Sequence, residues 1–490
     1  MNILSKPTNE KKEIARKKFL CLWTVLFLAF ALLPGIAEAA RKISLAECVE
    51  LALENNRDIE QSASDRDTAF HNYRAARRAM GPKLSWQTNA KRIGGKDYDA
   101  YHEAHDAGQP GIPAYKNEYE NALRLTIPLY TGGEQENRMV SARYGLNAAD
   151  LTLENSKQAV RYQVAAAYYR VLQRRALVGV EQEAVNTTGK HLENVTIGYE
   201  EGTIAKSDVL SSKVQLADKE QELESAQGNY INAVAELCNL IGVPVTEELD
   251  VEDGLYYQHY DISLSDAVSF AMDNRPDGIA ADYAAMQAKK AVDTAKSGYR
   301  PSLSVIVNKS LSGENAFKDD HSANWDAGLS LTWTPFDNGV TASNVSAAKS
   351  EWEKVNSVAK QTKEKIALDV KKAYTDLITA ERNIPRTRES VEIAKEDYTL
   401  VQLRYVEGID TNLAVTDAQE KLIAAQTNHV NALYNYLLAK AALDKAMGIP
   451  VDISAVRYLS ATEEGKSPRR ALEDATYSTD DQKKDEGNAP

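Results

Sequence analysis

The sequence predicts a mixed α/β membrane protein built from two tandem copies of one unit. Three observations predict it. Similar segments recur in the same order, long stretches have the 4-3-4 apolar spacing of packed helices, and four short stretches alternate apolar with polar residues. Only 7% of the 490 residues are aromatic and 26% are charged, which suits long helices better than a sandwich. The net charge of -13 argues against a nucleic-acid partner.

The first 39 residues are predicted to be a secretory signal peptide. Lysine and arginine residues between Lys11 and Lys18 precede an apolar run, which ends at an A-x-A site at Ala37–Ala39. We expect cleavage after Ala39; an uncleaved anchor helix is the alternative. After this segment no stretch is apolar enough to cross a bilayer as a helix.

The two copies are predicted to cover residues 40–262 and 263–453. "SLAECVELALENN" (44–56) matches "SLSDAVSFAMDNR" (263–275), and "GPKLS" (81–85) matches "RPSLS" (300–304), both at an offset of 219. From "LTIPLYTGG" (125–133) and "LTWTPFDNG" (331–339) onward the offset is 206. The first copy therefore has 13 extra residues, within the polar stretch 97–115, where glycine and proline predict a loop.

A long helix is predicted in each copy from an a/d seam of mostly apolar residues. The seam residues are Val160, Val164, Ala167, Val171 and Val178 in the first copy, and Ile366, Val370, Ala373, Leu377, Ala380 and Ile384 in the second. Residues 134–200 contain no proline, and at about 1.5 Å per residue this helix would be about 100 Å long. Pro385, and Gly179 at the matching position, predict a kink or break in each helix.

A glycine interrupts the helical pattern of each copy at matching points. Gly202 lies in "GYEEGTIAKSDVLS" and Gly408 in "RYVEGIDTNLAVTD". Because glycine adopts positive φ without strain and ends helices, both are predicted to turn the chain at the tip of a helical hairpin. Ser207 and Asp208 are candidate N-caps of the helix that follows.

Four strands are predicted, at about 83–96, 117–130, 302–311 and 324–336. In "WDAGLSLTWTP" apolar or small residues alternate with polar ones over about ten residues, as in a transmembrane β-strand with one lipid face and one lumen face. A half-buried sheet in a soluble domain is the alternative. Aromatic residues near the strand ends (Tyr119, Tyr130, Trp325 and Phe336) favour the membrane. Since open sheet edges cannot face lipid, several chains must pool their strands.

Few other residues in the sequence suggest catalysis, a disulfide or metal binding. Cys48 and Cys238 are 190 residues apart; we expect two core cysteines, with a disulfide as the alternative. His102 and His105 in "YHEAH" lack the HExxH spacing, so a solvated loop is expected rather than a metal site. No enzyme and no cofactor is predicted. Residues 454–490 are polar and are expected to be disordered.

In their order and spacing these features resemble the TolC-like outer-membrane factors. The resemblance rests on the repeated motifs together with "YEEGTIAKSDVL" and "LRYVEGIDTNLAVTDAQ", and it covers about residues 43–452. It implies a homotrimer in which each chain gives four strands to one twelve-stranded β-barrel, continued through the periplasm by a coiled-coil α-helical tunnel. The protein would be the passive outer-membrane exit duct of a tripartite efflux pump or type I secretion system, for small molecules or proteins.

The same resemblance implies the partners. They are a periplasmic adaptor, an inner-membrane pump of the RND, ABC or MFS type that supplies the energy, and the lipid of the outer membrane. A periplasmic coiled-coil structural or adaptor protein is the alternative; it would explain the seams and the signal peptide but not the alternating strands.

The resemblance also implies a pore constriction near the tips. By motif position Tyr405, Asp417 and Asp208 match constriction residues, whereas Asp410 stands where the family has its gate arginine and Ala414 where it has a second ring aspartate. A ring of Asp417 around the symmetry axis would attract cations. The hairpin tips that would dock the adaptor are marked by Gly202, Arg404 and Gly408.

Overall fold

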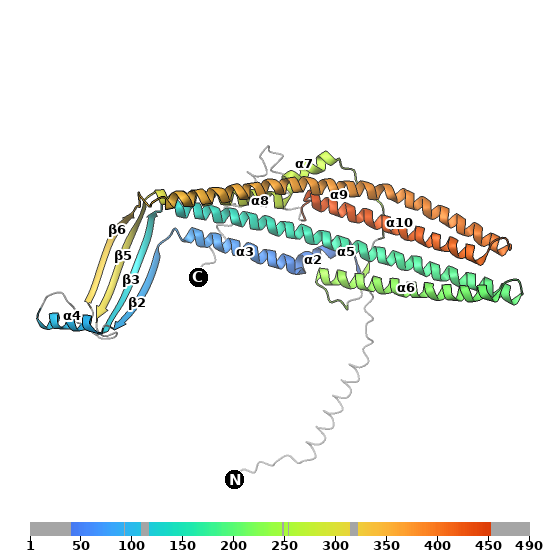
Figure 1. The fold of residues 1–490 in the computed structure, drawn as a ribbon, viewed down its shortest axis with the longest axis horizontal. Coiled ribbons are helices and arrows are strands. Elements are labelled where there is room, and N and C mark those ends of the chain that lie inside the picture. Colours follow the sequence, from blue (N-terminus) through green and yellow to red (C-terminus); the bar gives the residue numbers. More distant parts are fainter. Residues whose placement is uncertain are drawn as a thin grey trace, which may run out of the picture.

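The computed structural model describes residues 41–92, 94–108, 117–246, 249–252, 254–313 and 322–451. The predicted signal peptide (1–39) and the tail (454–490) lie outside these residues. The described chain is mostly helical and elongated, with a four-stranded sheet at one end and two helical hairpins at the other (Figure 1). We call these the sheet end and the tip end.

The helices of the first half are α2 (Leu45–Asn55), α3 (Arg57–Arg78), α4 (Lys96–Asp106), α5 (Glu134–Glu200) and α6 (Lys206–Ile241). Those of the second half are α7 (Leu264–Asn274), α8 (Pro276–Ala295), α9 (Val340–Val406) and α10 (Asn412–Met447), with a 3-10 turn at Lys296–Tyr299. The helices α5 and α9 have 67 residues each, and α6 and α10 have 36 each. Each long helix pairs with one shorter helix at the tip end, while α3 and α8 pack beside them near the sheet (Figure 1).

Burial follows the predicted seams. Val160, Val164 and Val171 of α5 are at most 2% exposed and lie in a first apolar core with α2, α6 and two short parallel strands, β1 (Arg41–Ile43) and β4 (Leu249–Val251). The α9 seam from Ile366 to Ile384 lies in a second core with α7 and α10. Burying one valine or leucine side chain contributes about 1.5–3 kcal/mol, so these seams supply much of the stability.

Both cysteines lie in the first core. Cys48 on α2 and Cys238 on α6 are fully buried in the same cluster. This location agrees with the prediction that they are core residues.

The predicted interruption of the long helices at Gly179 and Pro385 is not a break. Both α5 and α9 continue through these positions as single helices. Packing outweighs the local penalty of proline here, since Ile384, the residue before Pro385, is itself buried in the second core.

The predicted loop at 97–115 is wrong in its first part, because α4 covers Lys96–Asp106. That segment contains neither glycine nor proline, and Asp99 near its start complements the helix dipole. Glycine and proline occur only from Gly108 onward. The side chains of His102 and His105 are outside what the structure describes.

The strands form one antiparallel sheet in the order β2-β3-β5-β6. Their bounds are β2 (Lys83–Arg92), β3 (Asn117–Tyr130), β5 (Ser302–Gly313) and β6 (Ser322–Thr332). Two are shorter than predicted: β2 ends at Arg92 rather than 96, and β6 at Thr332 rather than 336. Gly95 has a φ of 89°, so it does not extend the backbone hydrogen bonding of β2. Pro335 has no N–H to donate, so it does not extend that of β6.

Candidate functional site

The sheet has one apolar face that other parts of the described chain leave exposed. The register places Trp86 opposite Leu123, Leu125 opposite Val307, and Val305 opposite Leu329. Because facing residues in a ladder share a side, these apolar side chains lie on one face. Trp86 is 75% exposed, Leu329 70% and Trp325 76%. Such a continuous apolar surface is typical of a contact with lipid or with another chain.

The opposite face is mainly polar. Its residues include Ser85, Gln87, Arg124, Thr126, Ser304, Asn308, Asp326 and Ser330. Across this face Asn308 donates a hydrogen bond to Asp326 at 2.9 Å. A sheet with one exposed apolar face and one polar face is what a wall between lipid and water requires.

The hairpin tips share one backbone design. Gly202 and Gly408 have φ values of 77° and 76°. In the first tip the N–H groups of Gly202 and Thr203 donate to the carbonyls of Tyr199 and Gly198; in the second, those of Gly408 and Ile409 donate to Tyr405 and Arg404. Each tip is thus a Schellman motif, in which a left-handed residue satisfies the last carbonyls of the helix. The predicted positive φ of both glycines is confirmed.

Side chains close the two tips differently. At the first tip Ile204 folds over the end of α5, where a Cβ on Gly198 would lie 2.5 Å from its Cδ1. At the second tip the position matching Gly198 is Arg404, whose Nε lies 3.1 Å from Asp410 Oδ2. Asp410, one of the predicted gate residues, therefore pairs within its own hairpin.

The interpretation of Ser207 and Asp208 as N-caps is wrong. The N-cap of α6 is Ala205, which has no side-chain cap, and Asp208 lies in the first helical turn, where its charge complements the helix dipole. On α10 the cap is Thr411, whose hydroxyl accepts from the N–H of Ala414 at 3.3 Å.

Tyr405 packs inward against the first hairpin. Its ring centroid lies 5.3 Å from that of His191 on α5. Burial, and then the charge of Asp208, raise the pKa of Tyr405. Its hydroxyl is buried and has no hydrogen-bond partner among the described residues. Among the predicted constriction residues, Tyr405 thus lies near enough to Asp208 to feel its charge.

Asp417 lies apart from Tyr405 and Asp208 on the surface of the chain. It lies on the exposed side of α10, with 63% of its side chain exposed, and pairs with Lys421 at 2.7 Å one turn along. The hydrogen bond and charge of Asp417 raise the pKa of Lys421. In a single chain the carboxylate points to solvent.

A group of buried polar residues between the two hairpins was missed. Thr188 is 2% exposed, His191 1%, Ser212 0%, Asn412 8% and Gln419 6%. The spacing of residues along α5 could have revealed this group. A 4-3-4-3 spacing joins Ala184, Thr188, His191, Val195 and Gly198. Polar residues at such positions are typical of a hydrogen-bonded contact between helices.

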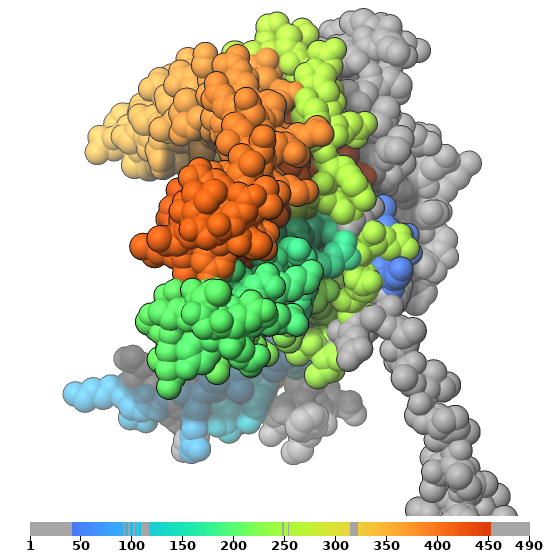
Figure 2. Space-filling model, turned by 90° about the vertical axis from the view of Figure 1, so that its right-hand side faces the viewer, coloured from blue at the N-terminus to red at the C-terminus, as the bar shows by residue number. Residues whose placement is uncertain are grey.

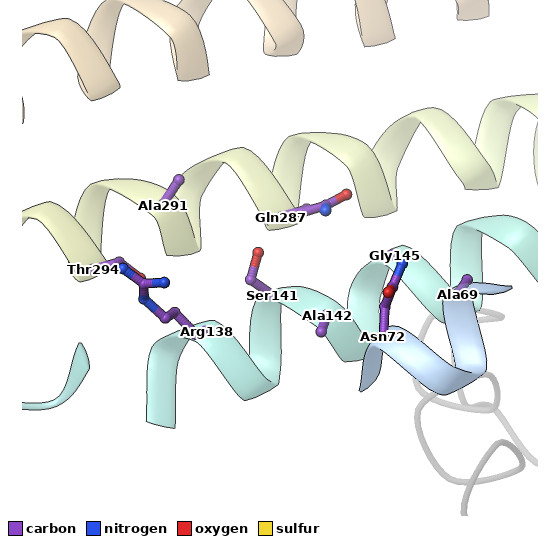
Figure 3. A pocket seen from close by; sticks show the side chains of 9 residues that line it. All are labelled: Ala69, Asn72, Arg138, Ser141, Ala142, Gly145, Gln287, Ala291 and Thr294. Atoms are coloured by element: carbon purple, nitrogen blue, oxygen red, sulfur yellow. The ribbon is translucent and has the colours of Figure 1, made fainter. Parts of the chain in front are cut away.

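A shallow hollow of about 410 Å³ lies near the sheet end. It lies between α3, α5 and α8, and is lined by small residues such as Ala142 and Gly145, with Arg138 at one end and Gln287 above them (Figure 3). Arg138 pairs with Glu134 at 2.6 Å. The nine lining residues include no nucleophile with an adjacent base.

In the described part of the chain no three His, Cys, Asp or Glu residues are grouped so that they could hold a metal ion. The described helices likewise include none whose length and apolarity would let it cross a membrane.

The comparisons with known proteins match this architecture. The model of the family "Outer membrane efflux protein" matches residues 48–243 and 267–449. The chain belongs to the outer membrane efflux protein family. It is 22% identical over 432 residues to the outer membrane protein TolC of Escherichia coli (85% of this chain, 84% of TolC). It is also 22% identical to the solvent efflux pump outer membrane protein SrpC of Pseudomonas putida (85% of this chain, 87% of SrpC).

Solved structures share the fold. The CmeC outer membrane channel of Campylobacter jejuni superposes with a TM-score of 0.72 at 18% identity, covering 86% of this chain and 89% of CmeC. The outer membrane protein VceC of Vibrio cholerae gives a TM-score of 0.71 at 18% identity, covering 83% and 97%. Among these proteins, SrpC belongs to a solvent efflux pump and CmeC is an outer membrane channel.

Proposed function

We propose that the protein is a passive exit duct in the outer membrane, serving a tripartite efflux pump or a type I secretion system. The observation that carries the proposal is the sheet: its apolar face is exposed while its opposite face is polar. A soluble protein would cover such a face, because exposed apolar area costs roughly 25 cal/mol per Å². Family membership supports the same conclusion.

The duct is a trimer in this proposal. In the sheet order β2-β3-β5-β6 the outer edges of β2 and β6 carry no neighbouring strand within the described chain. An open edge cannot face lipid, since each unpaired backbone group there costs several kcal/mol. Pairing β6 of one chain with β2 of the next removes every edge, and three copies give the twelve-stranded barrel of the TolC-like channels.

The helices continue the wall into the periplasm. Contacts join α3 to α5, α5 to α8 and α8 to α9, so these four helices lie in a row that extends from one end of the four strands (Figure 1). Three such rows closed around an axis make a tunnel. The length of α5 and α9, about 100 Å at 1.5 Å per residue, would carry it far from the membrane.

The tips close the tunnel and meet the partners. Tyr405, whose ring packs on His191, holds the second hairpin against the first near the charge of Asp208. Asp417, repeated three times around the axis, forms a cation-attracting ring. Asp410 stabilises the second tip through Arg404. The turns at Gly202 and Gly408, with Arg404 beside the second, present the surface on which a periplasmic adaptor docks, and an inner-membrane pump of the RND, ABC or MFS type supplies the energy.

Membrane fractionation of cells that express the full chain tests the proposal. We expect the protein in the outer-membrane fraction as an oligomer that boiling in detergent converts to a monomer. A soluble monomer in the periplasmic fraction would instead support a periplasmic coiled-coil structural or adaptor protein and would remove the duct.

A further inference from the structure

A lysine lies within the exposed apolar face of the sheet. Lys309 of β5 stands directly opposite Leu123 of β3 and Trp325 of β6. Because facing residues of a ladder share a side, Lys309 belongs to the apolar face, where its side chain is exposed. The sheet end stands clear of the hairpins: in the view from the tips, the pale-blue atoms of β2 and α4 lie behind the two hairpins and project past them (Figure 2).

Among the described residues, the neighbours of Lys309 on this face supply no counter-ion. Its neighbours along β5 and on the two flanking strands are Val307, Leu311, Asn121, Leu123, Leu125, Ala323, Trp325 and Ala327. This set contains no carboxylate. A lysine that faces lipid costs the most free energy at the centre of the bilayer and little near the interface with water. The position of Lys309 relative to that interface therefore decides what its charge can bind.

The apolar face turns polar just beyond the level of Lys309. Toward the helices this side of the sheet continues with Leu329 and Leu331 of β6. Toward the loop ends of the strands it continues on β2 and β3 with Thr88 and Asn121, where the Thr88 hydroxyl donates a hydrogen bond to Asn121 Oδ1 at 2.8 Å. A change from apolar to polar residues along one side of a membrane sheet is expected where the strands leave the hydrocarbon region.

Tryptophans support the same boundary. Trp86 and Trp325 lie in the row of Lys309, and both are largely exposed. Tryptophan favours the interface between lipid and water. Trp333, which is also exposed, follows Trp325 by eight positions, or about 27 Å along a strand and about 21 Å across a bilayer at a tilt of about 40°. This span is close to the apolar band of about 25 Å in outer-membrane barrels. Since the tips point into the periplasm in the proposed duct, the row of Lys309 marks the boundary on the cell-surface side.

We propose that Lys309 and Trp325 form a binding site for the phosphate group of an anionic lipid in the surface-facing leaflet of the membrane. The lysine ammonium is a compact point charge that binds phosphate, and the indole N–H beside it is a hydrogen-bond donor. The apolar stem of Lys309 lies along the strand while its charged end reaches the lipid headgroups. The inference rests on the proposed function, because it requires the apolar face of the sheet to lie against lipid.

Quenching of tryptophan fluorescence by brominated lipids tests the inference. The assembled oligomer carries Trp86→Phe and Trp333→Phe, so that Trp325 reports on the sheet, and is reconstituted with dibrominated phosphatidylglycerol or dibrominated phosphatidylcholine. We expect phosphatidylglycerol to be preferred at Trp325. Lys309→Gln should lower this preference about fivefold, the factor that corresponds to about 1 kcal/mol for one basic side chain near an anionic surface. Lys309→Arg should retain it. Lys83→Gln, which removes a lysine from the polar face of β2, is the matched control and should also retain it.

The outcomes separate the lipid site from the duct. Lys309→Gln removes a charge from the apolar face and should still assemble into the oligomer that boiling dissociates. Equal quenching of Trp325 by the two brominated lipids while Lys309 is present would overturn the lipid site. So would a preference that Lys309→Gln and Lys83→Gln change to the same extent. Quenching of Trp325 by neither lipid would show that the sheet does not contact the membrane, and would overturn the proposed function itself.

Discussion

Substituting alanine for glycine should have opposite effects at the tip of the first hairpin and inside its helix α6. At Gly202 the backbone has a φ of 77° and a Cβ would meet nothing within 4 Å, so the cost of alanine there is purely conformational. The left-handed conformation costs an L-residue roughly 1–2 kcal/mol. Gly228, inside α6, also has open space around a new Cβ. There alanine should stabilise the helix by roughly 0.8–1.0 kcal/mol, because glycine disfavours helix interiors.

Hydrogen exchange, measured by mass spectrometry on peptides of the first hairpin, detects both the loss of stability at the tip and the gain in α6. Gly202→Ala should speed the exchange of amides at the tip by about 5- to 30-fold, the factor that corresponds to 1–2 kcal/mol of local opening free energy. Gly228→Ala should slow exchange in α6 by about four- to fivefold. Gly202→Asn should cost less than Gly202→Ala, since asparagine tolerates the left-handed region better. If Gly202→Ala and Gly228→Ala shift exchange in the same direction, the Schellman account of the tips is refuted.

Three other predictions concern the sheet, the buried carboxyl group of Glu181 and the ring of Asp417. Leu329→Arg, on the apolar face, should reduce the amount of heat-dissociable oligomer in membranes, because arginine in lipid costs about 2–4 kcal/mol, whereas Ser330→Arg on the polar face should not. Burial, and then the charge of Glu222, raise the pKa of Glu181, so protonation is favoured in the folded protein. Thermal stability of the wild type should rise as pH falls through this raised pKa toward the ordinary value of about 4.3, and Glu181→Gln should lose that rise; an unchanged profile contradicts the assignment. Asp417→Ala should abolish block of the channel by divalent cations, and Lys421→Ala, which frees the carboxylate, should strengthen it; equal block in all three proteins excludes the ring.

The features that could be predicted from the sequence depend on the spacing of apolar residues and on local backbone conformation. The buried stripe from Ile366 to Ile384 and the positive φ of Gly202 and Gly408 are local consequences of side-chain spacing and of glycine's freedom, so a single chain suffices to infer them. The end of β2 and the presence of α4 were missed because composition alone does not locate where a helix begins within a polar stretch.

The contacts between the halves lay beyond sequence reasoning. His191 and Asn412 are 221 positions apart, and neither residue type points to the other. Likewise the pairing of Asp410 with Arg404 depends on how the tip turns: the Schellman motif reverses the chain and brings these two side chains together. A motif position therefore identifies such a residue but not its partner, because the partner depends on how the chain folds around it.

A water-filled passage through a membrane conducts ions, so the ion conductance of the purified protein decides whether this chain forms one. Purified wild-type protein added to a planar lipid bilayer, without adaptor, pump or nucleotide, should insert and produce discrete conductance steps. In the proposed duct the polar face of the sheet lines the passage, which needs no energy source. A bilayer that stays silent after incorporation of the assembled oligomer has been verified would contradict the account.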